Sequence, residues 1–292
     1  HQRLTLAEKG RGVDTLVMTA TPIPRTLLLT AYGDLDCSRL LDKPPGREPV
    51  DTRTIPNDRL GEVITSIGRA IKTGAKIYWV CPLIEESETI DLANAEARFA
   101  MLKEQFGDEV ELIHGRMKGP EKDAAMGRFS EGPANILVAT TVIEVGVDVP
   151  EASIMVIEHA ERFGLAQLHQ LRGRVGRGDQ RSTCLLVYAP PLTETARARL
   201  KMMRETDDGF LIAEEDLRLR GGGEILGTRQ SGIPAFRLAD LTSHADLLAI
   251  AQDDAKIILE MDPELKSKRG EALRTLLYLF ERDEAVTYLR SG

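Results

Sequence analysis

The sequence predicts an α/β fold in which a parallel β-sheet, covered by helices on both faces, is followed by a mainly helical C-terminal region. Two observations lead to this fold class. Between about residue 50 and residue 190, short apolar runs rich in β-branched residues alternate with helical stretches, which is typical of βαβ units. After Pro190-Pro191 the sequence becomes strongly charged and helical in character, and no further apolar strand-like run follows.

Each element can be placed from its local pattern. Ile64, Ile67 and Ile71 recur at helical spacing, and Gly74 is expected to end that helix. The other expected helices are Thr89–Phe106, Pro120–Phe129, Glu194–Glu205, Phe210–Leu219 and most of the chain after Leu238. Gly221–Gly223 should end the helix at Phe210–Leu219. The expected strands are Val50–Ile55, Lys76–Leu83, Val110–Ile113, Asn135–Ala139, Ser153–Ile157 and Thr183–Tyr188.

The first 45 residues differ from the rest because they are too short to bury a core. Leu16–Met18 is expected to be a strand, and Arg25–Ala31 an apolar helix. The breaker cluster Asp42–Gly46 is a candidate linker. We therefore divide the chain into residues 1–45, residues 46–190 as an α/β domain and residues 191–292 as a helical region.

Composition excludes several protein classes. The chain has 292 residues, of which 42% are hydrophobic, and no run approaches the roughly 20 apolar residues of a membrane span. The N-terminal residues lack a signal-peptide pattern, so we expect a soluble, cytoplasmic protein without a membrane partner. The three cysteines and five histidines form no zinc-like or disulfide-like spacing, so we expect no metal ligands, and Cys81 and Cys184 should be core residues.

An arginine-rich segment stands out against the net charge of −8, which argues against a generally basic surface. Between Arg162 and Arg181 there are five arginines and one acidic residue. Arg172, Arg174 and Arg177 surround two glycines, and guanidinium groups on a glycine-rich turn suit binding of phosphate oxygens. A solvated arginine-rich turn is the alternative for this pattern by itself.

A second polar segment follows the apolar strand that ends at Ala139. Thr140, Thr141, Gly146 and Asp148 come next, before Pro150. Hydroxyl groups at the carboxyl end of a parallel strand suit a phosphodiester, and an exposed carboxylate suits a ribose hydroxyl. An ordinary strand-loop connection is the alternative.

Together, in this order and at this spacing, the two segments resemble motifs V and VI of superfamily 2 helicases. Thr19-Ala20-Thr21-Pro22 resembles motif III, and Ile77–Leu83 is similar to motif IV of the second RecA-like domain. The runs TATPIPRTL, HGRM and QLHQLRGRVGR look like those of RecG and of the transcription-repair coupling factor. In the tail, DDGF and RGGGEILGTRQSG resemble the translocation element of the RecG family.

The resemblance implies roles for particular residues. Arg174 and Arg177 would reach ATP phosphates, with Gln170 at the same face and Asp148 on the ribose. Thr140, Thr141 and Gly146 would contact the DNA backbone. Residues that couple hydrolysis to movement would be Thr19, Thr21, Arg199, Arg220 and Gln230; for Arg199, a solvated helix face is the alternative.

The resemblance also implies what the chain needs from elsewhere. No GxxxxGK[ST] phosphate loop and no DExH run occur in the sequence, although the family uses them for ATP and Mg²⁺. We therefore expect residues 1–45 to be the remnant of a first RecA-like domain, and the chain to be a fragment that binds no cofactor tightly and is inactive alone. The parent would bind ATP, Mg²⁺ and branched DNA such as replication forks and Holliday junctions.

Two other interpretations remain open. The chain could come from a transcription-repair coupling factor, or it could be a non-catalytic nucleic-acid-binding module. Motif III, which has a role only beside a first RecA-like domain, favours a helicase part over a module. We also expect the apolar run Leu27–Leu29 to favour self-association.

Overall fold

The structure is a computed structural model, and it describes residues 48–82, 88–140, 149–178, 181–227 and 244–280, together with residues 16, 18, 38 and 40. Within these residues the chain forms a parallel six-stranded sheet with the strand order β1-β6-β5-β2-β4-β3. Its strands are β1 (Asp51–Pro56), β2 (Lys76–Val80), β3 (Val110–Ile113), β4 (Ile136–Ala139), β5 (Ala152–Ile157) and β6 (Thr183–Tyr188).

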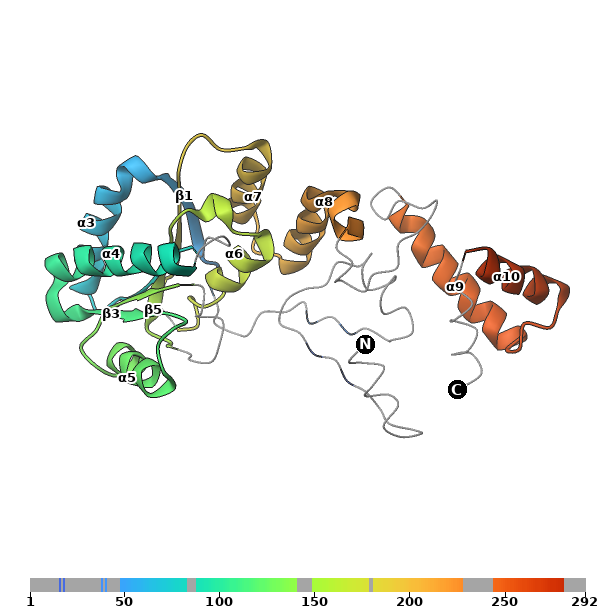
Figure 1. Cartoon of the computed structure of the whole chain (residues 1–292), viewed down its shortest axis with the longest axis horizontal. Helices are drawn as coiled ribbons and strands as arrows, with labels where there is room; N and C mark the ends of the chain where they lie inside the picture. Colours follow the sequence, from blue (N-terminus) through green and yellow to red (C-terminus); the bar gives the residue numbers. More distant parts are fainter. Residues whose placement is uncertain are drawn as a thin grey trace.

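The helices alternate with these strands and then continue beyond the sheet. They are α3 (Leu60–Ile71), α4 (Glu88–Phe106), α5 (Gly119–Ser130), α6 (Leu165–Arg172), α7 (Glu194–Glu205), α8 (Gly209–Gly227), α9 (Ala245–Met261) and α10 (Lys268–Leu279). Figure 1 shows α9 and α10 set apart from the sheet, with α8 between them and the sheet. The predicted fold class, a parallel sheet followed by a helical region, is therefore confirmed.

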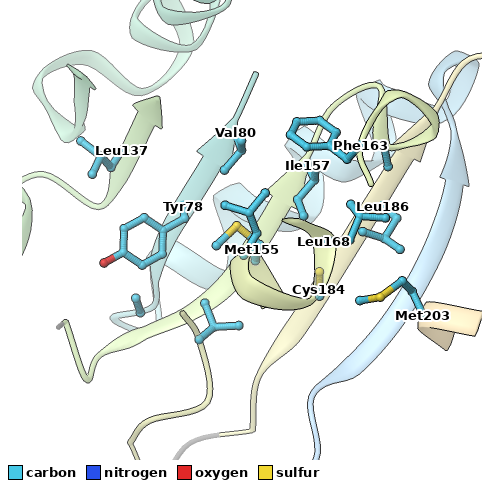
Figure 2. Close-up of a cluster of buried hydrophobic side chains, with 14 of the residues drawn as sticks. Tyr78, Val80, Leu137, Met155, Ile157, Phe163, Leu168, Cys184, Leu186 and Met203 are labelled. Atoms are coloured by element: carbon cyan, nitrogen blue, oxygen red, sulfur yellow. The ribbon is translucent and has the colours of Figure 1, made fainter. Parts of the chain in front are cut away.

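Two buried clusters hold the helices on opposite faces of the sheet. Alternate strand residues point to opposite faces, so Tyr78 packs with α5, α6 and α7, whereas Trp79 packs with α3 and α4. Figure 2 shows the first cluster, in which Leu168 of α6 and Met203 of α7 lie against the strands. Strands that are buried on both faces explain why continuous apolar runs predicted them correctly.

Most predicted boundaries agree with the structure, including Gly74, whose φ of +86° ends the turn after α3. Cys81 and Cys184 are buried, as expected.

The prediction that Gly221–Gly223 end a helix is wrong, because α8 continues through them to Gly227. Glycine costs about 1 kcal/mol relative to alanine in a helix, but its backbone forms the same hydrogen bonds, so the run weakens α8 without ending it. The strand expected at Leu16–Met18 and the helix at Arg25–Ala31 fall almost wholly outside the described residues.

No helix in the described part of the chain is long and apolar enough to cross a membrane.

Candidate functional site

The arginine-rich segment forms a tight turn directly after α6. Helix α6 begins after Gly164, whose backbone N–H donates to Gln167 Oε1 at 3.1 Å. After the helix, Val175 is fully buried and Gly176 has a φ of +76°, a conformation that favours glycine. Arg174 is half-buried and Arg177 is exposed, with its Nε donating to Gly173 O at 3.3 Å. The turn therefore holds one exposed and one half-buried arginine on an anchored backbone.

The arginine turn, residues 173–178, lies at the amino edge of the sheet. A Cβ placed on Gly178 would lie 2.6 Å from Pro150 O, just before β5 begins, and one placed on Gly176 would lie 3.1 Å from a methyl group of Val50, just before β1 begins. Gly178 thus allows the turn to approach the backbone before β5. Asp148, the expected ribose ligand two residues before Pro150, lies outside the described residues.

Gln170 lies on the exposed side of α6, one helical turn before Arg174. Arg174 lies beyond the end of α6, so a shared nucleotide-facing side for Gln170 and Arg174 stays a prediction.

Thr140, another expected binding residue, lies at the opposite edge of the sheet. Thr140 directly follows β4, and its backbone N–H donates to Ile113 O of the neighbouring β3 at 3.3 Å. Its side chain is 2% exposed, and Oγ1 has no hydrogen-bond partner among the described residues. Nδ1 of His114, which follows β3, is also buried and has no hydrogen-bond partner among the described residues. Two polar groups with unused hydrogen-bonding capacity therefore lie at the carboxyl edge, whereas Thr141 and Gly146 fall outside the described residues.

Arg172 does not share the surface with the other two arginines. Its side chain is 3% exposed, and its guanidinium donates to backbone carbonyls at the end of α7. Burial lowers the pKa of Arg172. The cluster seen in the sequence thus separates into an exposed Arg177, a half-buried Arg174 and a buried Arg172.

Arg199 is half-buried on α7, and its guanidinium donates to Phe163 O at 2.5 Å and to Glu161 O at 3.1 Å. A solvated helix face, the alternative for Arg199, is therefore wrong, since the side chain holds the loop that precedes α6. Arg220 lies within α8. Gln230, Thr19 and Thr21 lie outside the described residues.

One polar cluster was not anticipated from the sequence. Glu158, which follows β5, accepts two hydrogen bonds from Arg98 of α4, at 2.6 and 2.8 Å, and one from Trp79 Nε1 at 2.5 Å. Burial lowers the pKa of Arg98, but the hydrogen bond and the charge of Glu158 raise it by more, so the pKa is raised overall. The only sequence signal was an acidic residue at the end of an apolar strand. The cluster fixes the point at which the chain leaves β5 toward α6.

Two family models match the chain along most of its length. Residues 58–179 match "Helicase conserved C-terminal domain", and residues 206–283 match "ATP-dependent DNA helicase RecG, domain 3, C-terminal". The chain is 57% identical over 265 residues to the ATP-dependent DNA helicase RecG of Acidithiobacillus ferridurans, and 52% identical over 270 residues to that of Escherichia coli K12. Each match covers 90% of this chain and 39% of the relative, so the chain spans about two fifths of the length of these relatives.

The solved structures agree with this similarity. A structure described as RecG bound to a three-way DNA junction aligns with a TM-score of 0.65 and 47% identity, over 82% of this chain and 31% of that one. The family model for residues 206–283, the curated relatives and this structure all point to RecG, and the model for residues 58–179 agrees with a helicase. The chain belongs to the RecG family of ATP-dependent DNA helicases.

Proposed function

We propose that this chain forms the second RecA-like half of an ATP-dependent DNA helicase that translocates on duplex DNA and remodels branched DNA, including stalled forks and Holliday junctions, in repair and recombination. The observation that carries the proposal is the arginine turn, which holds the exposed Arg177 and the half-buried Arg174 on a glycine-anchored backbone within the segment that matches the helicase family model. This proposal assigns residues 1–45 to a first RecA-like domain, residues 46–190 to the second, and residues 191–292 to the translocation element and C-terminal helices.

In this proposal the amino edge of the sheet faces ATP that is bound mainly by the other RecA-like domain. Arg174 and Arg177 neutralise charge that develops on the phosphoryl oxygens, which is the role of arginine fingers. Gln170 orients the nucleotide from α6, and Asp148 contacts the ribose. Mg²⁺ enters only together with ATP, and we assign it no ligand from this chain. Among the described residues, no group of three or more His, Cys, Asp or Glu side chains could hold a metal ion.

The carboxyl edge of the sheet faces DNA in the same proposal. Thr140, Thr141 and Gly146 contact the phosphodiester backbone, and the unused hydrogen-bonding capacity of Thr140 supports this placement. Strands of four to six residues separate the two edges by roughly 13–20 Å. Hydrolysis must therefore act on DNA through movement of whole elements, and we assign this coupling to Thr19, Thr21, Arg199, Arg220 and Gln230.

Two other functions are less well supported. The match of residues 206–283 to the RecG model favours RecG over a transcription-repair coupling factor. The match of residues 58–179 to the helicase model favours a helicase half over a non-catalytic nucleic-acid-binding module. The proposal places the protein in the cytoplasm, with the DNA on which it acts. It also includes self-association of the isolated chain through Leu27–Leu29, which light scattering over a concentration series would test.

The test is a hybrid protein in which this chain replaces the matching C-terminal part of the Acidithiobacillus ferridurans helicase. We expect the hybrid to unwind a three-way DNA junction when ATP is present, and the 292-residue chain alone to hydrolyse no ATP with or without DNA. Vigorous ATP hydrolysis by the chain alone would contradict the half-site proposal. A well-folded hybrid that binds the junction but never unwinds it would favour the binding module.

A further inference from the structure

The sheet continues for one residue beyond four of its strands at the carboxyl edge. Each of these residues directly follows its strand, and we term them the carboxyl row: Glu158 after β5, Cys81 after β2, Thr140 after β4 and His114 after β3. The first three donate their backbone N–H groups to the last residue of the neighbouring strand, at 2.9, 2.8 and 3.3 Å. The row is therefore held together, across four neighbouring strands, by main-chain hydrogen bonds.

The side chains of the carboxyl row belong to one face of the sheet. Two positions before each member lies a residue of the cluster that packs with α3 and α4, namely Val156, Trp79, Val138 and Leu112. Alternate residues of a strand point to the same face. The four side chains are thus expected side by side on the face that α3 and α4 cover.

One end of the row is anchored by an arginine of α4. The carboxylate of Glu158 accepts hydrogen bonds from Arg98 at 2.6 and 2.8 Å and from Trp79 Nε1 at 2.5 Å. The guanidinium carbon of Arg98 also lies 5.7 Å from the centre of the Trp79 ring, and Cys81 Sγ lies 3.9 Å from Glu158 Oε1. Helix α4 is therefore joined to the β5 and β2 end of the row.

The other end of the row keeps unused hydrogen-bonding capacity. Oγ1 of Thr140 and Nδ1 of His114 are buried and have no partner among the described residues. Two strand spacings, roughly 10 Å, separate Glu158 from Thr140. A displacement of Glu158 would thus reach Thr140 through the shared main-chain hydrogen bonds of the row.

The ion pair between Arg98 and Glu158 is poorly explained by stability alone. Its side chains are only 20% and 11% exposed, and a buried ion pair often contributes no more than apolar residues of similar size. A bidentate arginine–carboxylate pair does fix both distance and orientation, which apolar contacts do not. The pair also neutralises the one acidic side chain of the row, which would otherwise repel a phosphate group.

We propose that Arg98 is a positioning residue for DNA binding: by holding Glu158 against α4, it keeps the carboxyl row in the arrangement in which Thr140 meets the phosphodiester backbone. The inference rests on the proposed function, which places DNA at this edge of the sheet. Arg98 itself does not touch DNA, and it acts through Glu158 and the main chain of the row.

The test variant is the double substitution Glu158→Gln with Arg98→Met, which removes both charges together. Because no unpaired charge is left buried, much of the stability should be retained, although the bidentate link is lost. The matched control is Glu111→Gln with Arg128→Met. Arg128 of α5 donates to Glu111 of β3 at 2.5 and 2.7 Å, so this pair also joins a helix to a strand, but it lies inside β3 and not at the row.

The readout is the concentration of three-way junction that gives half-maximal stimulation of ATP hydrolysis by the hybrid protein. The test variant should raise this concentration by about tenfold, the change expected when one hydrogen bond to a charged group is lost, with the maximal rate unchanged. The control should change neither value. An unchanged junction concentration in a stable test variant would overturn the proposal, and so would a fall in the maximal rate alone.

Thr140→Val shows whether the effect passes through Thr140. This substitution removes the hydroxyl group and keeps the size of the side chain. In a hybrid that already carries Thr140→Val, the test variant should raise the junction concentration little further, because the contact that it misplaces is already absent. A full additional tenfold rise would contradict action through Thr140.

Hydrogen exchange on the 292-residue chain, measured for single amides by NMR, tests the positioning without DNA or ATP. In the test variant the amides of Cys81 and Thr140 should exchange faster, whereas those of Trp79 and Val138 inside the strands keep their protection. Unchanged exchange at the row, or equal acceleration throughout the sheet, would refute the positioning. A wild-type hybrid that the junction does not stimulate would instead contradict the proposed function, and the exchange experiment would still decide the role of Arg98.

Discussion

Gly178→Ala tests directly whether the arginine turn lies against the start of β5. The Cβ of alanine would lie 2.6 Å from Pro150 O and 3.4 Å from Pro150 C, and the obstacle is backbone rather than a flexible side chain. The turn must therefore move away. Forcing an additional carbon into such a contact costs about 1–3 kcal/mol. Alanine also restricts the unfolded chain more than glycine does, which raises the free energy of unfolding by roughly 0.4–1 kcal/mol. This gain offsets only part of the cost, so we expect a net loss of stability.

The assay is urea unfolding of the 292-residue chain, followed by circular dichroism. Gly127→Ala is the matched control because Gly127 lies inside α5 with no atom within 4 Å of an added Cβ, so it should gain about 0.5–1 kcal/mol. The midpoints of the two variants should thus move in opposite directions. Equal or greater stability of Gly178→Ala relative to wild type would refute the close approach, and with it the position of Arg174 and Arg177 at the amino edge of the sheet.

Three further outcomes follow from the described contacts. Glu158→Gln leaves the guanidinium of Arg98 without its negative partner, so unfolding in urea should show a loss of about 1–3 kcal/mol, much of which an additional Arg98→Met change should restore. Burial raises the pKa of Glu161, but hydrogen bonds from His159 and from main-chain N–H groups lower it by more, to below its ordinary 4.5. Its stabilising contribution is therefore complete above that value and lost as the pH falls through the folded pKa, so Glu161→Gln should destabilise at about pH 7, and its difference from wild type in urea unfolding should shrink as the pH falls below 4.5. Burial raises the pKa of Cys184 to about 12, so iodoacetamide should modify this thiol only as fast as the sheet unfolds, and rapid labelling of the native chain would contradict its burial.

Much of the fold could be predicted because both faces of its strands are buried. A strand such as β6, buried between two layers, is apolar along most of its length and bounded by polar residues, so its limits were predicted without error. Helix α6 gave no comparable signal. It has only eight residues, and its polar side chains alternate with leucines that pack on the sheet, so its sequence indicates a motif more clearly than a helix.

The residues of the candidate site were predictable where they form a contiguous run, and not where their positions depend on packing. Arg174 and Arg177 lie within one short motif, so their proximity needed no structure. Arg172 belongs to the same run, but its burial depends on carbonyl groups more than 30 residues away on α7. The partner of Glu158 is Arg98, 60 residues away on α4, and no local pattern links the two residues.

We propose that the arginine turn forms one side of an ATP-binding site whose other side belongs to the first RecA-like domain. The most direct test is DNA-stimulated ATP hydrolysis by the hybrid protein with and without Arg177→Ala, with thermal unfolding measured in parallel. We expect the wild-type hybrid to hydrolyse ATP, and Arg177→Ala to lose at least about 1000-fold in turnover, the scale of an arginine finger, while its unfolding temperature is unchanged. Full turnover by a correctly folded Arg177→Ala hybrid would contradict a role for the turn in hydrolysis.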